Sequence, residues 1–306
     1  MSHKIGIPQA LLYYRYYPAW KSFFEELGCE VVESNQSTKD IVDTGVRLTV
    51  DEACFPVKLF LGHVDYLKDK VDYLFLPRVI SIDSNEYLCP KFMGLPDMVR
   101  YSINDLPKII EETVNLRENK LNLIKVALEI GNKLNKNYLQ VSKALIKSLV
   151  KLRNHRKELI NSKSLESEYK IAILGHEYII YDSYISMGLI EKLKKLGIEV
   201  VTAEMLPNYA VNKGLSYLSK DMFWTLGKKM MGAAYYFFEQ SDIDGIIQLT
   251  AFGCGPDSLV GEMIERKNKK REDVAFMSLN LDEHTGEAGL ITRLEAFIDM
   301  IQWEGV

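Results

Sequence analysis

The chain of 306 residues is longer than a usual single domain, so its length favours two domains with a sizeable core. Its hydrophobic content of 47% and charged content of 26% are ordinary for a soluble globular protein. A formal net charge of −4 disfavours nucleic acid or an anionic membrane as the main partner. The sequence has no run of the roughly 18 apolar residues that a membrane helix needs and no signal-peptide pattern, so we expect a cytoplasmic protein.

The first hundred residues alternate between strand and helix patterns. An aromatic-rich amphipathic helix is predicted from about residue 11 to residue 27, between strands at residues 4–8 and 30–33. The apolar run at residues 71–77 has the character of a buried strand in a parallel sheet. We therefore expect an N-terminal α/β domain over residues 1–104.

The pattern changes between residues 105 and 168. Here the sequence shows helical periodicity without strand signals, and residues 137–160 are rich in Lys, Leu and Arg. If helical, this last run spans about 36 Å. We expect residues 105–168 to form a helical connection between two α/β halves, with a hinge at residues 163–168. A contact within a homodimer is the alternative role for the long helix.

The second half repeats the opening pattern of the first. It begins with a strand at residues 170–174 and reaches Leu196-Gly197 before a strand at residues 198–201, much as Leu27-Gly28 precedes the second strand of the first half. Two similarly built α/β units explain this repetition. We expect the second of them over residues 169–306.

Four cysteines in a chain expected in the cytosol point to ligands or catalytic groups rather than to disulfides. Cys54, Cys89 and Cys254 each have a proline within two residues, and each lies near a predicted strand-to-helix junction. Free N–H groups and the helix dipole stabilise an anion at such a helix start. Cys29 lies between a helix end and a strand, where a small buried residue is expected. The wide separation of these cysteines excludes a Cys-x-x-Cys motif. On spacing alone, the alternative is that the three scattered cysteines have no common function.

Three thiolates without a fourth cysteine leave two kinds of metal site open. One is zinc completed by a histidine, and the other is a cubane iron–sulfur cluster with one iron left open. The histidines that could complete or adjoin such a site are His63, His176 and His284. For each of them, an ordinary hydrogen-bonded structural role is the alternative. Nucleophilic catalysis by Cys254 with His284 as base is a third possibility, but it leaves the other cysteines without a role.

Four motifs, in this order along the chain, resemble the acyl-CoA dehydratase activase-related family. They are DEACFPVK at residues 51–58, YLCPK at 87–91, FGCGPDS at 252–258 and DEHTGEAG at 282–289. That family is related to the 2-hydroxyacyl-CoA dehydratase subunits and to the double-cubane cluster proteins. The resemblance implies two Rossmann-like three-layer α/β domains with parallel sheets and a cluster held by three cysteines between them.

Carried over by position, the resemblance implies that Cys54, Cys89 and Cys254 hold a 4Fe–4S cluster or an 8Fe–9S double cubane. The groups expected near the cluster are Glu52, His63, His176, His284 and Glu287. The resemblance also implies an oxygen-sensitive protein that receives low-potential electrons from a separate ATP-dependent iron–sulfur activator and acts on a small molecule.

The resemblance leaves the role of the chain itself open. Because the sequence lacks the glycine-rich ATP-binding turn of the activator, we expect it to be the electron acceptor. The dehydratases pair two different subunits, whereas this is a single short chain. It could therefore be a reductase or a 2-hydroxyacyl-CoA dehydratase-like enzyme, or a non-catalytic electron-transfer or scaffold subunit of a dehydratase-like complex.

Overall fold

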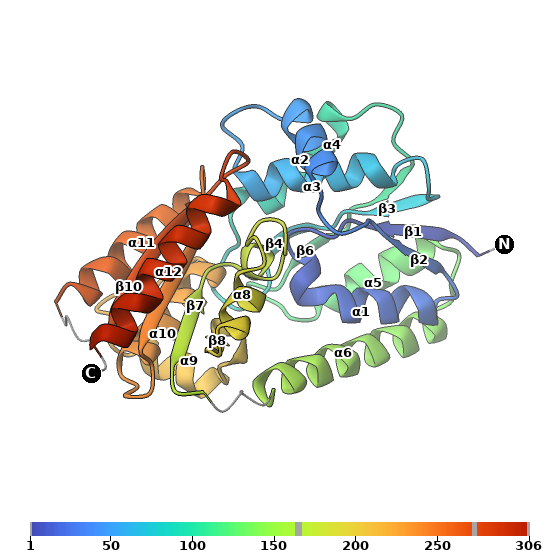
Figure 1. Cartoon of the computed structure of the whole chain (residues 1–306). Helices are drawn as coiled ribbons and strands as arrows, with labels where there is room; N and C mark the ends of the chain where they lie inside the picture. The colour runs from blue at the N-terminus through green and yellow to red at the C-terminus, as the bar shows by residue number, and fades with distance from the viewer. Residues whose placement is uncertain (1, 163–166, 271–273, 305–306) are drawn as a thin grey trace. The chain divides into compact units, whose positions relative to one another are not determined.

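The computed structural model describes residues 2–162, 167–270 and 274–304 (Figure 1). The chain divides into two compact units, each an α/β fold with a parallel sheet, as predicted. Unit 1 comprises Met1–Glu158 and Phe223–Thr225, and unit 2 comprises Leu159–Met222 and Leu226–Val306. Among the helices of the described residues, none has both the length and the apolar character that crossing a membrane requires.

Unit 1 is built around a four-stranded parallel sheet in the order β2-β1-β3-β5, with a separate parallel pair, β4-β6. Up to residue 160 the elements are β1 (Lys4–Ile7), α1 (Tyr13–Glu26), β2 (Glu30–Glu33), α2 (Lys39–Leu48), α3 (Phe55–Leu67), β3 (Tyr73–Phe75), β4 (Arg78–Ser81), α4 (Pro90–Ser102), β5 (Lys108–Ile110), β6 (Thr113–Asn115), α5 (Asn122–Lys133) and α6 (Tyr138–Ile160). Helices α2, α3 and α4 lie on one side of the four-stranded sheet, and α1, α5 and α6 lie on the other (Figure 1).

The aromatic stripe of α1 forms the centre of the unit 1 core. Phe24 is fully buried and meets Phe75 of β3 edge to face, with ring centroids 5.0 Å apart. Ile130 of α5 and Ala144 of α6 belong to the same core. The two helices after residue 121 are therefore part of unit 1, because their apolar faces complete its core.

The middle segment differs in two ways from the expected helical connection. It contains two strands, β5 and β6, of three residues each, which are too short to give a periodic pattern and depend on the pairing that β3 and β4 provide. Residues 105–158 also belong to unit 1 rather than to a separate connection. Of the expected hinge at residues 163–168, residues 163–166 lie outside the described part of the chain.

Unit 2 contains a parallel sheet in the order β10-β9-β7-β8. From residue 167 onward the elements are β7 (Lys170–Leu174), α7 (Glu177–Ile180), α8 (Leu189–Lys195), β8 (Glu199–Thr202), a 3₁₀ turn η1 (Ala203–Met205), α9 (Asn208–Leu215), α10 (Thr225–Phe238), β9 (Gly245–Ala251), α11 (Gly255–Asn268), β10 (Ala275–Leu281) and α12 (Glu287–Glu304). Its core joins α10 through Phe237 and Phe238 to Ile246 of β9 and Val260 of α11.

The two sheets share one plan. Counted along the chain within each four-stranded sheet, the strands lie in the order 2-1-3-4. In both units the helix before the second strand ends in Leu-Gly, with Gly28 at φ 73° and Gly197 at φ 76°, a left-handed conformation that favours glycine. The predicted repetition of two similar α/β units is confirmed. In such a sheet the crevice for a ligand lies at the carboxyl ends of the first and third strands, where the strand order reverses.

Candidate metal centre

The three predicted cysteines occupy the same kind of position in the fold. Cys54 is the N-cap residue of α3, Cys89 of α4 and Cys254 of α11, and each helix has a proline at its first or second position. All three cysteines are partly exposed. Proline suits the helix start because its missing N–H has no partner there in any case. The helix start expected at each of these thiols is therefore a shared feature of the folded chain. The predicted strand-to-helix setting is wrong for Cys54, which lies between the helices α2 and α3, whereas Cys89 and Cys254 follow the strands β4 and β9.

Cys29 has a different environment, as expected for a small buried residue. It follows the helix-ending Gly28, precedes β2 and is 7% exposed within the unit 1 core. Burial raises the pKa of its thiol, which the positive charge of Lys136 offsets only in part. This cysteine is protonated and inert at neutral pH, whereas the three N-cap cysteines each adjoin a helix N-terminus.

Two of the N-cap cysteines begin helices at corresponding places in the chain order of the two sheets, although the additional strand β4 precedes α4 in unit 1. Cys89 begins α4, which lies between the third and fourth strands of the unit 1 sheet. Cys254 begins α11, which lies between the third and fourth strands of the unit 2 sheet. Cys54 begins α3, between the second and third strands of unit 1. The repeated fold thus places a thiol at one equivalent helix start in each unit.

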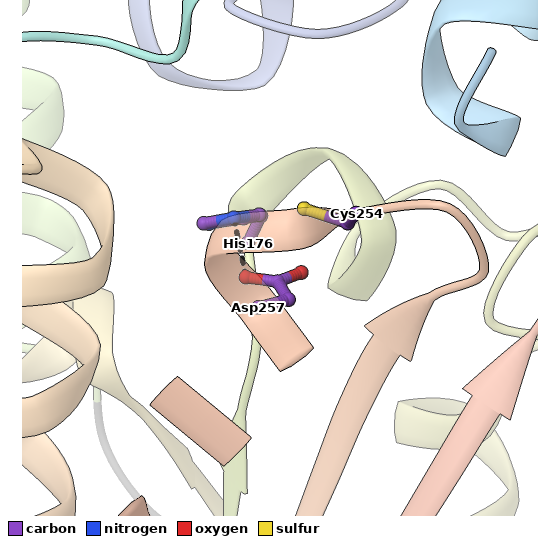
Figure 2. Close-up of side chains that lie close together, drawn as sticks. All are labelled: His176, Cys254 and Asp257. Carbon is purple, nitrogen blue, oxygen red and sulfur yellow. Dashed lines mark ion pairs between the residues drawn. The ribbon is translucent and has the colours of Figure 1, made fainter. Parts of the chain in front are cut away.

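Unit 2 brings Cys254 together with His176 and Asp257 (Figure 2). His176 follows β7, and Cys254 and Asp257 come from the start of α11 after β9. His176 Nε2 lies 2.7 Å from Asp257 Oδ1, and one donor atom from each of the three residues lies within 4.8 Å of the others. The side chains of His176 and Asp257 are buried, and Figure 2 shows the Cys254 sulfur directed toward the His176 ring.

The sheet topology explains why these three residues meet. β7 and β9 are the first and third strands of the unit 2 sheet and lie side by side, so their carboxyl ends form the crevice of the fold. Between β7 and His176 stands Gly175, where a Cβ atom would lie 2.7 Å from the carbonyl oxygen of Leu249 in β9. The absence of a side chain at this glycine lets the loop with His176 approach β9 closely.

Further charged groups surround the histidine. Lys229 of α10 lies with Nζ 3.0 Å from Oε1 of Glu204 and 3.4 Å from Oε1 of Glu177, and both carboxyl groups are buried. Burial by itself lowers the pKa of His176, but the negative charge and hydrogen bond of Asp257, with smaller contributions from the two glutamates, outweigh it and raise the pKa. Three carboxylate groups therefore act on the His176 ring.

The other predicted neighbours of the cysteines lie in different settings. His63 is fully buried nine residues along α3 from Cys54, about 13 Å along the helix axis. Its Nε2 lies 3.0 Å from Ser37 Oγ. His284 is exposed in the loop after β10, and Glu287 is exposed and paired with Lys192. Glu52 is exposed in the segment just before α3. Of the predicted histidines, His176 is the one that the described residues group with a cysteine.

The unit 2 centre consists of His176, Cys254 and Asp257 with the surrounding Glu177, Glu204 and Lys229. Four of these residues had no role in the predictions made from the sequence. Glu177 and Glu204 each lie within three residues of the end of a strand, β7 and β8 respectively. A charged residue just after a strand of a parallel sheet indicates a possible ligand site, so the sequence alone could have pointed to both glutamates. Asp257 appeared in a motif, but nothing linked it to His176. Lys229 stands in the middle of an ordinary helical pattern, where no local signal marks it.

None of the curated proteins matches the chain. One similar solved structure is a glucosamine-6-phosphate deaminase from Thermotoga maritima, 9% identical, with 94% of this chain and 77% of that chain covered. Its TM-score of 0.21 is too low to carry an argument.

A family model matches residues 4–206, which includes Cys54, Cys89 and His176 and ends before Cys254. The match extends over unit 1 and into unit 2 and covers more than half of the 306 residues. It agrees with the resemblance that the motifs indicated. The chain belongs to the family described as the CoA enzyme activase uncharacterised domain (DUF2229).

Proposed function

We propose that this chain is an iron–sulfur protein in which Cys54, Cys89 and Cys254 hold a 4Fe–4S cluster or an 8Fe–9S double cubane. The observation that carries the proposal is that each of these cysteines is the N-cap of a helix with proline at its first or second position. Thiolates are the ligands that iron–sulfur clusters use, and helix N-termini stabilise the negative charge of such a cluster. The equivalent positions of Cys89 and Cys254 further support a common role.

The family description supports the choice of partner. Membership of a family described by CoA enzyme activation favours a role beside an activating protein, and we propose that an ATP-dependent iron–sulfur activator supplies the electrons. When bound, the cluster would supply low-potential electron transfer and an iron with an open position. The three N-cap cysteines would hold it, and the helix N-termini would offset its charge.

The same family description favours a second candidate for the role of the chain. It could be a non-catalytic electron-transfer or scaffold subunit that serves an enzyme acting on a CoA thioester. Purified chain given reductant, activator and a 2-hydroxyacyl-CoA separates the two. Turnover by the chain alone supports a dehydratase-like enzyme, and turnover that requires an added partner protein supports the subunit.

Metal content tests the cluster directly. Chain purified without oxygen should contain about four irons with matching sulfide, or about eight irons for a double cubane, with the corresponding Mössbauer and EPR signatures. Cys89→Ser should lose most of this iron, because one of three thiolate ligands is missing. Cys29→Ser is the matched control and should keep it. An iron-free, colourless anaerobic preparation, or equal iron in both variants, would contradict the proposal.

A further inference from the structure

The unit 2 centre contains the donor set of a mononuclear metal site. Cys254 offers a thiolate, His176 an imidazole nitrogen and Asp257 a carboxylate, and one donor atom from each lies within 4.8 Å of the others. All three residues belong to unit 2 and lie at the carboxyl ends of neighbouring strands. The arrangement therefore needs neither Cys54 nor Cys89.

Asp257 provides an independent sign that something binds here. Its side chain is fully buried, and Oδ1 faces His176. Oδ2 has no hydrogen-bond partner within the described part of the chain. Leaving a buried carboxylate oxygen without a partner costs free energy, because the oxygen has lost its hydration without compensation. A cation at this point would satisfy that oxygen.

The spacing of the donors suits one ion rather than two irons of a cubane. Around a tetrahedral ion with ordinary bond lengths, sulfur, nitrogen and oxygen donors lie about 3.3 to 3.6 Å from one another. The present donors lie within 4.8 Å of one another, with His176 Nε2 2.7 Å from Asp257 Oδ1, and these separations bracket that range. Ligands on different irons of a cubane point away from each other and lie farther apart. A mixed set of thiolate, imidazole and carboxylate is typical of zinc and other divalent first-row transition ions.

The position and surroundings agree with an ion that keeps one coordination position open. The site lies in the crevice where the strand order of unit 2 reverses, which is where α/β sheets bind ligands. Glu177 and Glu204 add negative charge around His176, and this favours a cation over an anion. Three protein ligands and a free fourth position are the pattern of zinc sites that act on a bound molecule.

We propose that Cys254, His176 and Asp257 form a binding site for a single divalent transition-metal ion of the zinc type, with an open fourth position. The site goes beyond the proposed cluster. Both proposed sites use Cys254 as a ligand. The single ion therefore binds only when Cys254 is not bound to the iron–sulfur cluster.

Cobalt titration of a chain that cannot hold the cluster tests this site separately. The full chain with Cys54→Ser and Cys89→Ser is purified free of metal and titrated with Co²⁺ without oxygen. Absorption from thiolate-to-cobalt charge transfer reports a cysteine ligand. We expect saturation at one equivalent, loss of this absorption when Cys254→Ser is added, and at least tenfold weaker binding when His176→Gln is added. His284→Gln in the same background is the control and should bind as the parent does.

Because His176 and Asp257 form a buried pair, removing one partner can unfold unit 2. The paired change His176→Gln with Asp257→Asn keeps two neutral hydrogen-bonding groups, and circular dichroism verifies that the variant is folded. Weaker binding by this folded variant supports the site. Unchanged binding, or the absence of charge-transfer absorption in the folded parent, overturns it. Because Cys54 and Cys89 are already replaced, neither result depends on whether the natural chain holds an iron–sulfur cluster.

Discussion

At the scale of single residues, His63 shows how burial changes the chemistry of a side chain. It lies fully buried on α3 with Nε2 3.0 Å from Ser37 Oγ, and burial lowers its pKa from 6.5 to about 3. The ring is therefore neutral in the folded chain across the physiological range. This environment suits a structural histidine, which was the alternative to a role beside the cluster.

The lowered pKa predicts a specific loss of stability in acid. Between pH 6.5 and pH 3 the unfolded chain binds a proton at His63 that the folded chain does not bind, so acid favours unfolding. From pH 7 to pH 5 this group should lower the free energy of unfolding by about 2 kcal/mol. His63→Gln should remove that part of the decrease, as measured by urea unfolding at the two pH values.

Ser37→Ala is the control for this prediction, because it removes the hydrogen bond and keeps the histidine. Its pH dependence should follow that of the natural chain. An identical pH dependence in His63→Gln and the natural chain would show that His63 is accessible to protons in the folded state.

At the scale of elements, α2 and α3 touch through a pair of glycines. A Cβ atom at Gly45 of α2 would lie 2.0 Å from the carbonyl oxygen of Lys58, and one at Gly62 of α3 would lie 2.0 Å from the carbonyl oxygen of Ile41. The two backbones are thus in direct contact. This contact positions α3, and with it Cys54 at the N-terminus of that helix.

Gly45→Ala should therefore disrupt unit 1 although alanine is the better helix former. The added methyl group would force the helices apart, with an expected loss of about 1–3 kcal/mol in the free energy of unfolding, or a failure to fold. Gly94→Ala in α4 is the matched control, because a Cβ atom there meets nothing within 4 Å, and it should leave stability unchanged or raise it by up to about 1 kcal/mol. Denaturant unfolding of both variants decides the point, and equal effects would rule out the close contact.

At the scale of the whole molecule, two units with one strand order contribute different numbers of cysteines to the proposed cluster. Cys54 and Cys89 belong to unit 1, and Cys254 belongs to unit 2. A cluster bound by all three would link the folding of the two units, because a ligand that binds only the folded form adds to its stability.

Removing the metal should accordingly lower the thermal stability of the entire chain. We expect the Tm of anaerobically purified chain to fall when a chelator removes its iron, because the bound cluster stabilises only the folded form. In Cys254→Ser the chelator should have little effect, since iron binding is already weak. Differential scanning calorimetry without oxygen measures both. A Tm that is equal with and without iron would argue against a cluster held by both units.

Much of this architecture follows from the sequence alone. The alternation of strand and helix patterns predicted two parallel α/β units, and the repeated Leu-Gly before the second strand predicted their common plan, because helix ends and buried strands leave local signals. The proline within two residues of each of Cys54, Cys89 and Cys254 indicated three helix starts for the same reason.

Other features were decided only by tertiary structure. The short strands β5 and β6 form because they pair with β3 and β4. Helices α5 and α6 belong to unit 1 because their apolar side chains pack against Phe24 and its neighbours in the core. His176 and Asp257 stand far apart in the sequence and meet because β7 and β9 are neighbours in the sheet. Strand order depends on contacts between residues far apart in the sequence. A local pattern could therefore identify His176 as a candidate but not Asp257 as its partner.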